Sequence, residues 1–202
     1  MKKQFIAIVF MIGAFVNAQS VKEATGSLAS LKNQTSVNVE FDYSNLKLMK
    51  ENLTEAEYIK NRSEDLNKKT PGVGDSLIKK WKGSKEMIWT PKFLELVNVV
   101  LFKEKKSIIF KEDNKAAKYT VEVKVDWIYP GWDAGVMKQP AKVTTTIKLV
   151  ETANRSNVLY QAKFIDAPGD QWGNNFSNES RIGEGIAKSG KTLAKLILKQ
   201  IK

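Results

Sequence analysis

The feature that most constrains the fold is a run of alternating apolar and polar side chains over residues 119–129. Its larger apolar side chains recur at every second position, and they are Tyr119, Val121, Val123, Val125, Trp127 and Tyr129. Side chains along a strand point alternately to its two faces, so this spacing predicts a long strand with one face in a core. Shorter alternations predict further strands over 37–43, 143–149 and 158–164.

Helical signals fill much of the remaining chain. Thr54 and Glu57 have the spacing of a capping box, which predicts a helix from this point to about residue 68. Thr90-Pro91 predicts the start of a middle helix, because a hydroxyl residue precedes a proline at the first helical position. A final amphipathic helix is predicted over 180–201, and its apolar stripe is formed by Ile182, Ile186, Leu193, Leu196, Ile197 and Ile201.

The order of these elements indicates the fold class. A strand, then helices, then a meander of strands and a closing helix predict an α+β fold. We expect helices packed on a mostly antiparallel sheet of about five strands. This single domain is predicted to span residues 36–202. Residues 19–35 are small and polar without a sustained period, which predicts a flexible lead-in.

The first 18 residues have the order of a secretory signal peptide. Lys2 and Lys3 precede an apolar run of 12 residues, 5–16, and small residues follow up to Ala18. A membrane-spanning helix needs about 20 apolar residues, so cleavage near Ala18 is favoured over anchoring. We therefore expect a secreted or periplasmic protein that begins at Gln19 and has no transmembrane segment in its mature form.

The charge of the chain is strongly basic. Thirty-three lysines and arginines oppose 22 acidic residues, for a net charge of +11, of which Lys2 and Lys3 contribute two. Such a surface could bind a polyanion or a membrane surface, or it could simply be well solvated. Arginine is scarce beside lysine, and base readout in nucleic acids depends on arginine. No nucleic-acid partner is expected.

The absence of histidine and cysteine limits the chemistry. It excludes His/Cys zinc sites, Ser-His-Asp triads and thiol nucleophiles. Carboxylate chemistry, as in glycoside hydrolysis, remains open. We expect no cofactor and no metal.

Two short segments match motifs of nucleotide-binding and hydrolytic proteins. Residues 185–192 match the P-loop pattern, but they lie inside the predicted last helix, with no strand before them. Residues 74–77 spell Gly-Asp-Ser-Leu, as in one class of esterases, but the chain has no histidine to deprotonate the serine. We interpret both matches as coincidental.

Three parts of the chain together resemble a family of bacterial envelope proteins. They are Thr90-Pro91, the strand over 119–129 and the segment 181–201. The domain is similar to that of curli-secretion-type and penicillin-binding-protein-activator lipoproteins and their relatives of unknown function. Those relatives usually carry a lipidated cysteine, which this chain lacks. The resemblance implies a non-enzymatic role in envelope assembly or as an adaptor.

Two loops form the candidate binding site. If the strands over 119–129, 143–149 and 158–164 pair antiparallel in sequence order, loops 130–135 and 166–173 lie at the same end of the sheet. Both loops are rich in glycine and acids, and the candidate ligand-binding residues are Trp132, Asp133, Asp170 and Trp172. Flat aromatic rings beside acids suit a sugar or a peptide. Alternatively, both tryptophans cap the end of the core and the glycines only form turns.

The sequence thus favours a non-enzymatic binding or adaptor domain of a bacterial cell envelope, with an envelope protein or glycan as its partner. A carboxylate-based glycan-active enzyme is one alternative. A basic module that binds a polyanion or a membrane surface is the other.

Overall fold

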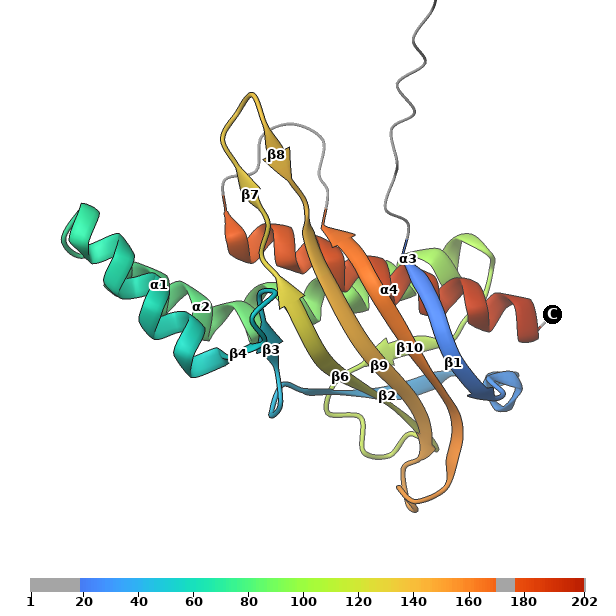
Figure 1. Cartoon of the computed structure of the whole chain (residues 1–202). Coiled ribbons are helices and arrows are strands. Elements are labelled where there is room, and N and C mark those ends of the chain that lie inside the picture. The colour runs from blue at the N-terminus through green and yellow to red at the C-terminus, as the bar shows by residue number, and fades with distance from the viewer. Residues whose placement is uncertain (1–18, 170–176, 202) are drawn as a thin grey trace, which may run out of the picture.

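The computed structural model describes residues 19–169 and 177–201, and it shows a sheet with helices packed on one face (Figure 1). The predicted α+β class is confirmed. Within the described residues, no helix has the length and apolar character needed to cross a membrane.

The sheet has eight strands, and its pairing is mixed. The strands are β1 (Ser20–Gly26), β2 (Ser36–Asp42), β3 (Lys47–Leu48), β4 (Leu53–Thr54), β5 (Ile109–Lys111), β6 (Tyr119–Tyr129), β9 (Ala141–Glu151) and β10 (Val158–Gly169). The main order is β1-β10-β9-β6-β2-β5, with β3 paired to β4 and β6. Neighbours from β1 to β6 are antiparallel, as predicted, whereas β2 is parallel to both β6 and β5. The parallel pair β2–β5 arises because the helices between these strands form the long crossover that parallel neighbours need.

The predicted strand over 119–129 is confirmed as β6, but its alternation breaks at a bulge. The register with β9 shifts between Val125 and Trp127. Val121 to Val125 place their apolar side chains in the core, and beyond the bulge Ile128 takes the core position. Trp127 and Tyr129 are only half-buried. A bulge adds one residue to a strand and so transfers the following side chains to the other face.

The predicted flexible lead-in over 19–35 is wrong, because this segment is part of the fold. Residues 20–26 form β1, which pairs antiparallel with β10, and η1 (Ala29–Leu31) follows. Leu28 and Leu31 are buried in the core. β1 is an edge strand with mostly exposed side chains, so backbone hydrogen bonds to β10 hold it in place. For the same reason its sequence shows no alternation of apolar and polar residues.

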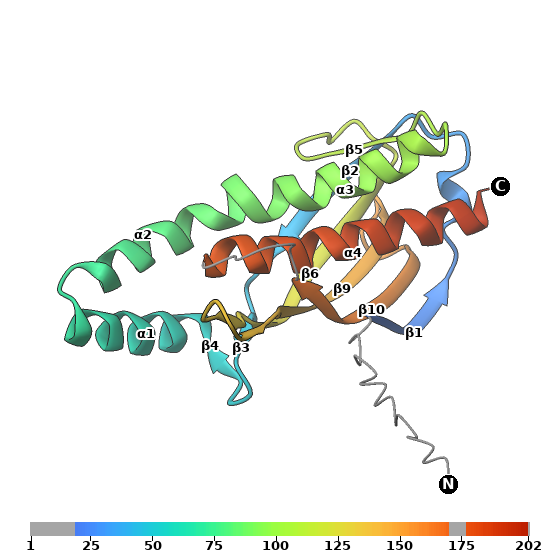
Figure 2. The ribbon, with the colours of Figure 1, turned by 90° about the horizontal axis from the view of Figure 1, so that it is seen from above.

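The helices are α1 (Glu55–Lys69), α2 (Val73–Ser84), η2 (Lys85–Trp89), α3 (Thr90–Lys103) and α4 (Asn178–Gln200). The predicted capping box is confirmed, since the Thr54 hydroxyl accepts from the Glu57 backbone N–H while the Glu57 carboxylate accepts from that of Thr54. α3 and α4 lie side by side over the sheet, and the α1–α2 pair extends beyond it (Figure 2).

Thr90-Pro91 does not start a separate helix, which corrects the sequence prediction. The backbone angles are helical at Ser84 and Lys85 and again at Trp89 and Thr90. Between α2 and α3, η2 is a π-helical segment that continues the helix. The Thr90 N–H donates to the carbonyl of Lys85, five residues earlier. A proline inside a helix removes one hydrogen bond and collides with the carbonyl four residues before it. The widened π turn fits Pro91 into a continuous helix.

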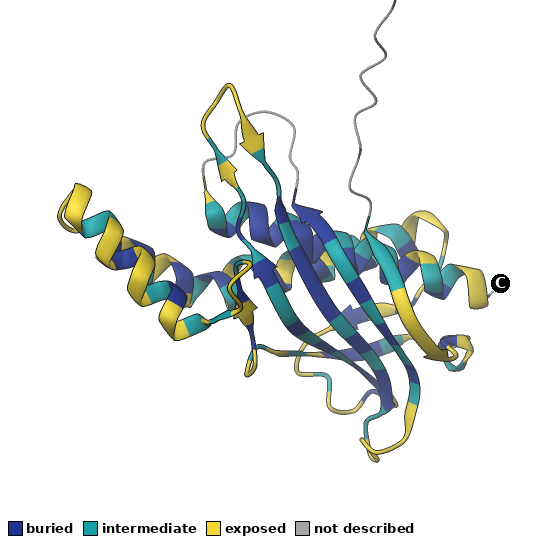
Figure 3. Ribbon diagram, in the orientation of Figure 1, coloured by how far each residue is buried: buried dark blue, intermediate teal, exposed yellow. Residues whose placement is uncertain are grey.

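The predicted last helix is confirmed as α4, and its glycines allow close packing. A Cβ atom on Gly185 would lie 2.7 Å from Val143 Cγ2, and one on Gly190 would lie 2.6 Å from the Phe93 carbonyl oxygen. The P-loop-like segment 185–192 therefore lies within a helix packed on β9 and α3. The burial pattern shows the same arrangement, with the inner face of α4 buried against the sheet (Figure 3).

Candidate functional site

A hairpin at one end of the sheet carries the first half of the candidate site. β7 (Trp132–Asp133) pairs with β8 (Lys138–Gln139), and the pair projects beyond β6 and β9 (Figure 1). Gly131 has φ +66°, and a Cβ atom there would lie 2.3 Å from the Gln139 carbonyl oxygen. Only glycine fits this close approach, which turns the chain out of β6 into the hairpin.

β6 and β10, the strands before the two predicted loops, end on the same side of the sheet. The predicted loop bounds are corrected, because residues 166–169 belong to β10 itself and Trp132 and Asp133 form β7. Tyr129, the last residue of β6, and Pro168, near the end of β10, both pair with Lys142 of β9. The strand directions assumed from the sequence are thus confirmed. Asp170 and Trp172 lie outside the described residues, so their meeting with Trp132 and Asp133 stays a prediction.

A cavity of about 310 Å³ lies at the base of the hairpin. Its walls come from α1, from the turn between β3 and β4, from β6 and β7, and from the start of α4. The lining residues are Met49, Tyr58, Arg62, Tyr129, Pro130, Gly131, Trp132, Asp133, Asn178 and Arg181. Both described members of the candidate site, Trp132 and Asp133, therefore line one cavity.

Hydrogen bonds to one amide orient two of the aromatic rings. The Tyr129 hydroxyl and the Trp132 Nε1–H both donate to Oε1 of Gln139, at 3.0 and 3.2 Å. Trp127 stacks on Tyr129 from the neighbouring position, with ring centroids 6.4 Å apart. Trp132 remains 42% exposed, so its ring is accessible beside the cavity. The structure therefore does not support the alternative that Trp132 is a buried cap of the core.

Asp133 has a local structural role as well as its place in the cavity. One of its carboxylate oxygens accepts the Gly135 N–H at 2.8 Å, which stabilises the hairpin turn. Gly135 has φ +81°, as a tight turn of this kind requires. Asp133 also lies close enough to Arg181 to favour the charged state of its guanidinium.

Arg181 anchors α4 to the turn that follows β6. It is only 5% exposed, its Nε–H donates to the Pro130 carbonyl at 3.2 Å, and Nη2 donates to the Gly131 carbonyl at 3.3 Å. Nη2 also donates to the Asn178 side chain. Burial lowers the pKa of Arg181, while Asp133 and Glu179 oppose this effect. Arg181 stays cationic at neutral pH, since an arginine titrates only in strong alkali.

Arginine is concentrated at this cavity. The chain has three arginines, and two of them, Arg62 and Arg181, line it. The planar guanidinium group suits carboxylates and phosphates better than the ammonium group of lysine does. Sequence reasoning missed both residues. One signal for Arg181 was available in the sequence. Arg181, Gly185 and Ser189 follow one another at intervals of four residues, which places a charged residue and two small ones on the same face of the helix. In the structure this face is buried.

A second cavity, of about 310 Å³, lies on the open face of the sheet and carries carboxylates. Its lining residues are Glu40, Phe41, Asp42, Glu122, Lys124, Thr146 and Lys148. Arg155 binds Glu40 at 2.7 and 3.0 Å and Glu122 at 3.3 Å, and its hydrogen bonds lower the pKa of Glu40. A general acid for glycoside hydrolysis needs a raised pKa. These two carboxylates form an ion-pair network instead.

Comparison with known proteins shows a distant similarity to solved structures. No protein-family description and no curated protein matches the chain. The PelC dodecamer from Paraburkholderia phytofirmans is 14% identical with a TM-score of 0.40, covering 89% of this chain and 97% of that chain. A variant of that PelC in another crystal form is 12% identical with a TM-score of 0.36 and the same coverage. Similarities of this size assign neither a family nor a function.

Proposed function

We propose that the chain is a non-enzymatic binding or adaptor domain of a bacterial cell envelope, and that it holds a glycan in the cavity at the base of the β7–β8 hairpin. The observation that carries the proposal is the accessible, hydrogen-bond-oriented ring of Trp132 beside Tyr129 and two arginines. Aromatic faces stack on sugar rings, and nearby polar groups hold their hydroxyls.

The charges of the cavity favour a sugar that carries a carboxylate. Arg62 is exposed at the surface whereas Arg181 is buried, so the two cations lie at different depths. Asp133 is the acidic residue among the lining residues, which leaves an excess of positive charge. A bidentate contact from Arg62 would place an acidic sugar against Trp132.

Catalysis by carboxylates has less support. Arg155 forms ion pairs with both Glu40 and Glu122 on the open face of the sheet. The hairpin cavity offers Asp133, whose carboxylate already accepts a backbone hydrogen bond in its own turn. Glycoside hydrolysis needs two carboxyl groups with separate roles about 5 to 10 Å apart. The binding role therefore fits these residues better than the enzymatic alternative.

A secreted or periplasmic location is part of the proposal. It rests on the charge, length and small-residue order of the first 18 residues, and the resemblance to envelope lipoprotein domains agrees with it. Mass spectrometry of the exported protein should find a chain that begins at Gln19. An exported protein that retains Met1 would contradict this location signal.

Calorimetric titration of the purified protein with soluble glycan fragments from the host envelope tests the binding role. Replacing Trp132 with alanine should weaken binding at least about tenfold, as expected for an aromatic side chain central to a site. Arg62→Gln should weaken binding to acidic fragments more than to neutral ones. Val136→Ala is the matched control, because Val136 lies at the hairpin tip and is 99% exposed.

Two results would decide against the glycan. Equal affinity of the wild-type protein and Trp132→Ala would show that the cavity is not the site. Binding to an envelope protein that Trp132→Ala abolishes, with no glycan binding, would keep the site and replace its ligand.

A further inference from the structure

An exposed apolar surface lies where α3 ends and β5 begins, apart from the hairpin cavity. Phe102 is 79% exposed, Ile109 55% and Val99 39%, and we refer to these three residues as the α3–β5 patch. They line a broad surface depression of about 950 Å³. Among the described residues it has no lining residue in common with the hairpin cavity. Apolar side chains gathered on a surface in this way indicate an interaction site.

Lysines border the α3–β5 patch. Lys103, Lys105 and Lys106 line the same depression, and Glu104 is the acidic residue within this turn. Within residues 19–169 and 177–201, none of the three lysines takes part in an ion pair. Their positive charge is therefore available to an anionic partner.

One of these lysines occupies a position where glycine is the usual residue. Lys105 has φ +55° and follows Glu104, the residue that caps the C-terminal end of α3. Its N–H donates to the Phe102 carbonyl at 2.9 Å, and the Lys106 N–H donates to the Leu101 carbonyl at 3.0 Å. These two bonds form a Schellman motif, in which the left-handed residue is most often glycine because a side chain there is strained. A cation is held at the border of the patch despite this strain.

The edge of β5 is closed to an added strand. The backbone of Phe110 is hydrogen-bonded to the side chain of Asn98 on α3. The Phe110 N–H donates to the Asn98 side-chain oxygen at 2.8 Å, and the Asn98 amide nitrogen donates to the Phe110 carbonyl at 2.9 Å. A peptide could pair with this edge only by displacing Asn98. A partner of this surface would therefore contact the exposed side chains of Phe102 and Ile109 through apolar groups, not pair with the backbone of β5.

We propose that the α3–β5 patch docks on an anionic membrane surface. Phe102 and Ile109 would enter the boundary between headgroups and acyl chains, while the three lysines contact lipid phosphates. Lysine suits this role because its apolar stem lies along the patch while its ammonium group reaches the headgroups. The net positive charge, which stays strongly basic without Lys2 and Lys3, attracts the whole protein to such a surface.

Cosedimentation with vesicles tests the proposal. The wild-type protein should bind vesicles of equimolar phosphatidylcholine and phosphatidylglycerol, and bind vesicles of phosphatidylcholine alone only weakly. Phe102→Ser should weaken the binding about tenfold, because the variant has no large apolar side chain to transfer from water into the membrane. Lys105→Gly should weaken it about fivefold, as expected for one lysine near an anionic surface. The same variant should unfold at an equal or higher temperature, since it relieves the backbone strain.

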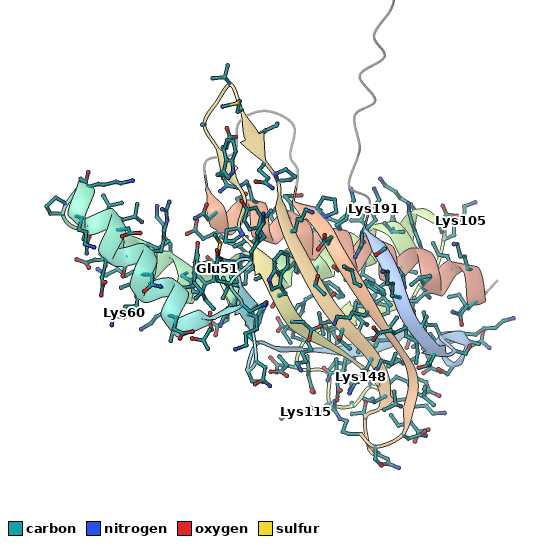
Figure 4. The ribbon with its side chains drawn as sticks, viewed as in Figure 1. Glu51, Lys60, Lys105, Lys115, Lys148 and Lys191 are labelled. Atoms are coloured by element: carbon teal, nitrogen blue, oxygen red, sulfur yellow. The ribbon has the colours of Figure 1, made fainter. Side chains whose placement is uncertain are left out.

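Two matched variants serve as controls. Met87 is also 79% exposed but lies on η2, so Met87→Ser should leave vesicle binding unchanged. Lys60 on α1 and Lys105 lie at opposite ends of the molecule (Figure 4), so Lys60→Gln removes a charge away from the patch. Vesicle binding that is unaffected by Phe102→Ser, or that is equal on neutral vesicles, would overturn the proposal. If vesicles do not bind while Phe102→Ser abolishes self-association in light scattering, the patch contacts a second copy instead.

Discussion

Arg155 and Arg181 each bind several partners, although arginine is rare in this chain. Arg181 joins α4 to the carbonyls of Pro130 and Gly131, and so positions the base of the hairpin cavity. Arg155 binds two carboxylates on different strands. Lysine could not replace either of them, because its single ammonium group lacks the planar set of donors.

The Arg155 network predicts a dependence of stability on pH. Arg155 holds the pKa of Glu40 below its ordinary value of 4.5. Because the pKa is lowered in the folded state, the stabilisation is present above pH 4.5 and is lost as the pH falls through the folded value. Arg155→Gln should lower the free energy of unfolding by at most about 1 kcal/mol at neutral pH, since both partners are partly exposed. In urea unfolding at about pH 3, the difference from wild type should shrink. A difference that grows on acidification would contradict the assignment.

Residues of α4 provide a test of the P-loop interpretation. Leu193 is fully buried, so Leu193→Ala should lower the free energy of unfolding by roughly 2–4 kcal/mol. Lys191→Ala should change it by less than about 0.5 kcal/mol, as replacements near the surface usually do. Both values can be measured by denaturant unfolding. Saturable ATP binding that Lys191→Ala removes would show that the segment is a nucleotide site after all.

At the scale of elements, two irregularities decide where side chains point. The bulge in β6 takes Trp127 and Tyr129 out of the core face, and Tyr129 then lines the hairpin cavity. The π segment η2 keeps α2 and α3 in one continuous helix through Pro91. Both features change the direction of side chains without interrupting the element that carries them.

Replacement of Pro91 distinguishes a helix interior from a helix start. In the interior, Pro91→Ala restores a backbone donor and removes the ring that the widened π turn accommodates, so the free energy of unfolding should rise, by up to about 3 kcal/mol. At a first helical turn, the same change would lower it by about 0.4–1 kcal/mol, because the unfolded chain gains freedom. The sign measured by thermal or urea unfolding identifies the position, and a decrease would restore the helix start predicted from the sequence.

At the scale of the whole molecule, the sheet brings distant segments to one end. β6 and β10 both run antiparallel to β9, so Tyr129 and Gly169 end their strands on the same side of the sheet. The start of α4 and one face of α1 complete the hairpin cavity there. The patch at the end of α3 is a separate surface, so ligand binding and membrane docking could occur together.

Trp172 provides the test of the two-loop site. If the chain after Gly169 places Trp172 beside the hairpin, Trp172→Ala should impair glycan binding as Trp132→Ala does, with little change in thermal stability. The reason is that both rings would contact one ligand, whereas neither would support the core. Unchanged binding in Trp172→Ala, measured by the same calorimetry, would limit the site to the hairpin cavity.

The sequence by itself determined the elements whose signals are local. Alternation over 119–129 predicted β6 and helical spacing predicted α4, because these patterns reflect which side chains of one element face the core. The capping box predicted the start of α1, because it reflects hydrogen bonds between residues close in the sequence. The sequence also placed Trp132 and Asp133 beyond the end of β6, although it did not predict that they form the strand β7. Only the tertiary structure decided that residues 20–26 form an edge strand, that β2 pairs in parallel, and that Arg181 lies under the hairpin. These features depend on backbone hydrogen bonds and close contacts between segments far apart in the chain, which leave no periodic trace in either segment.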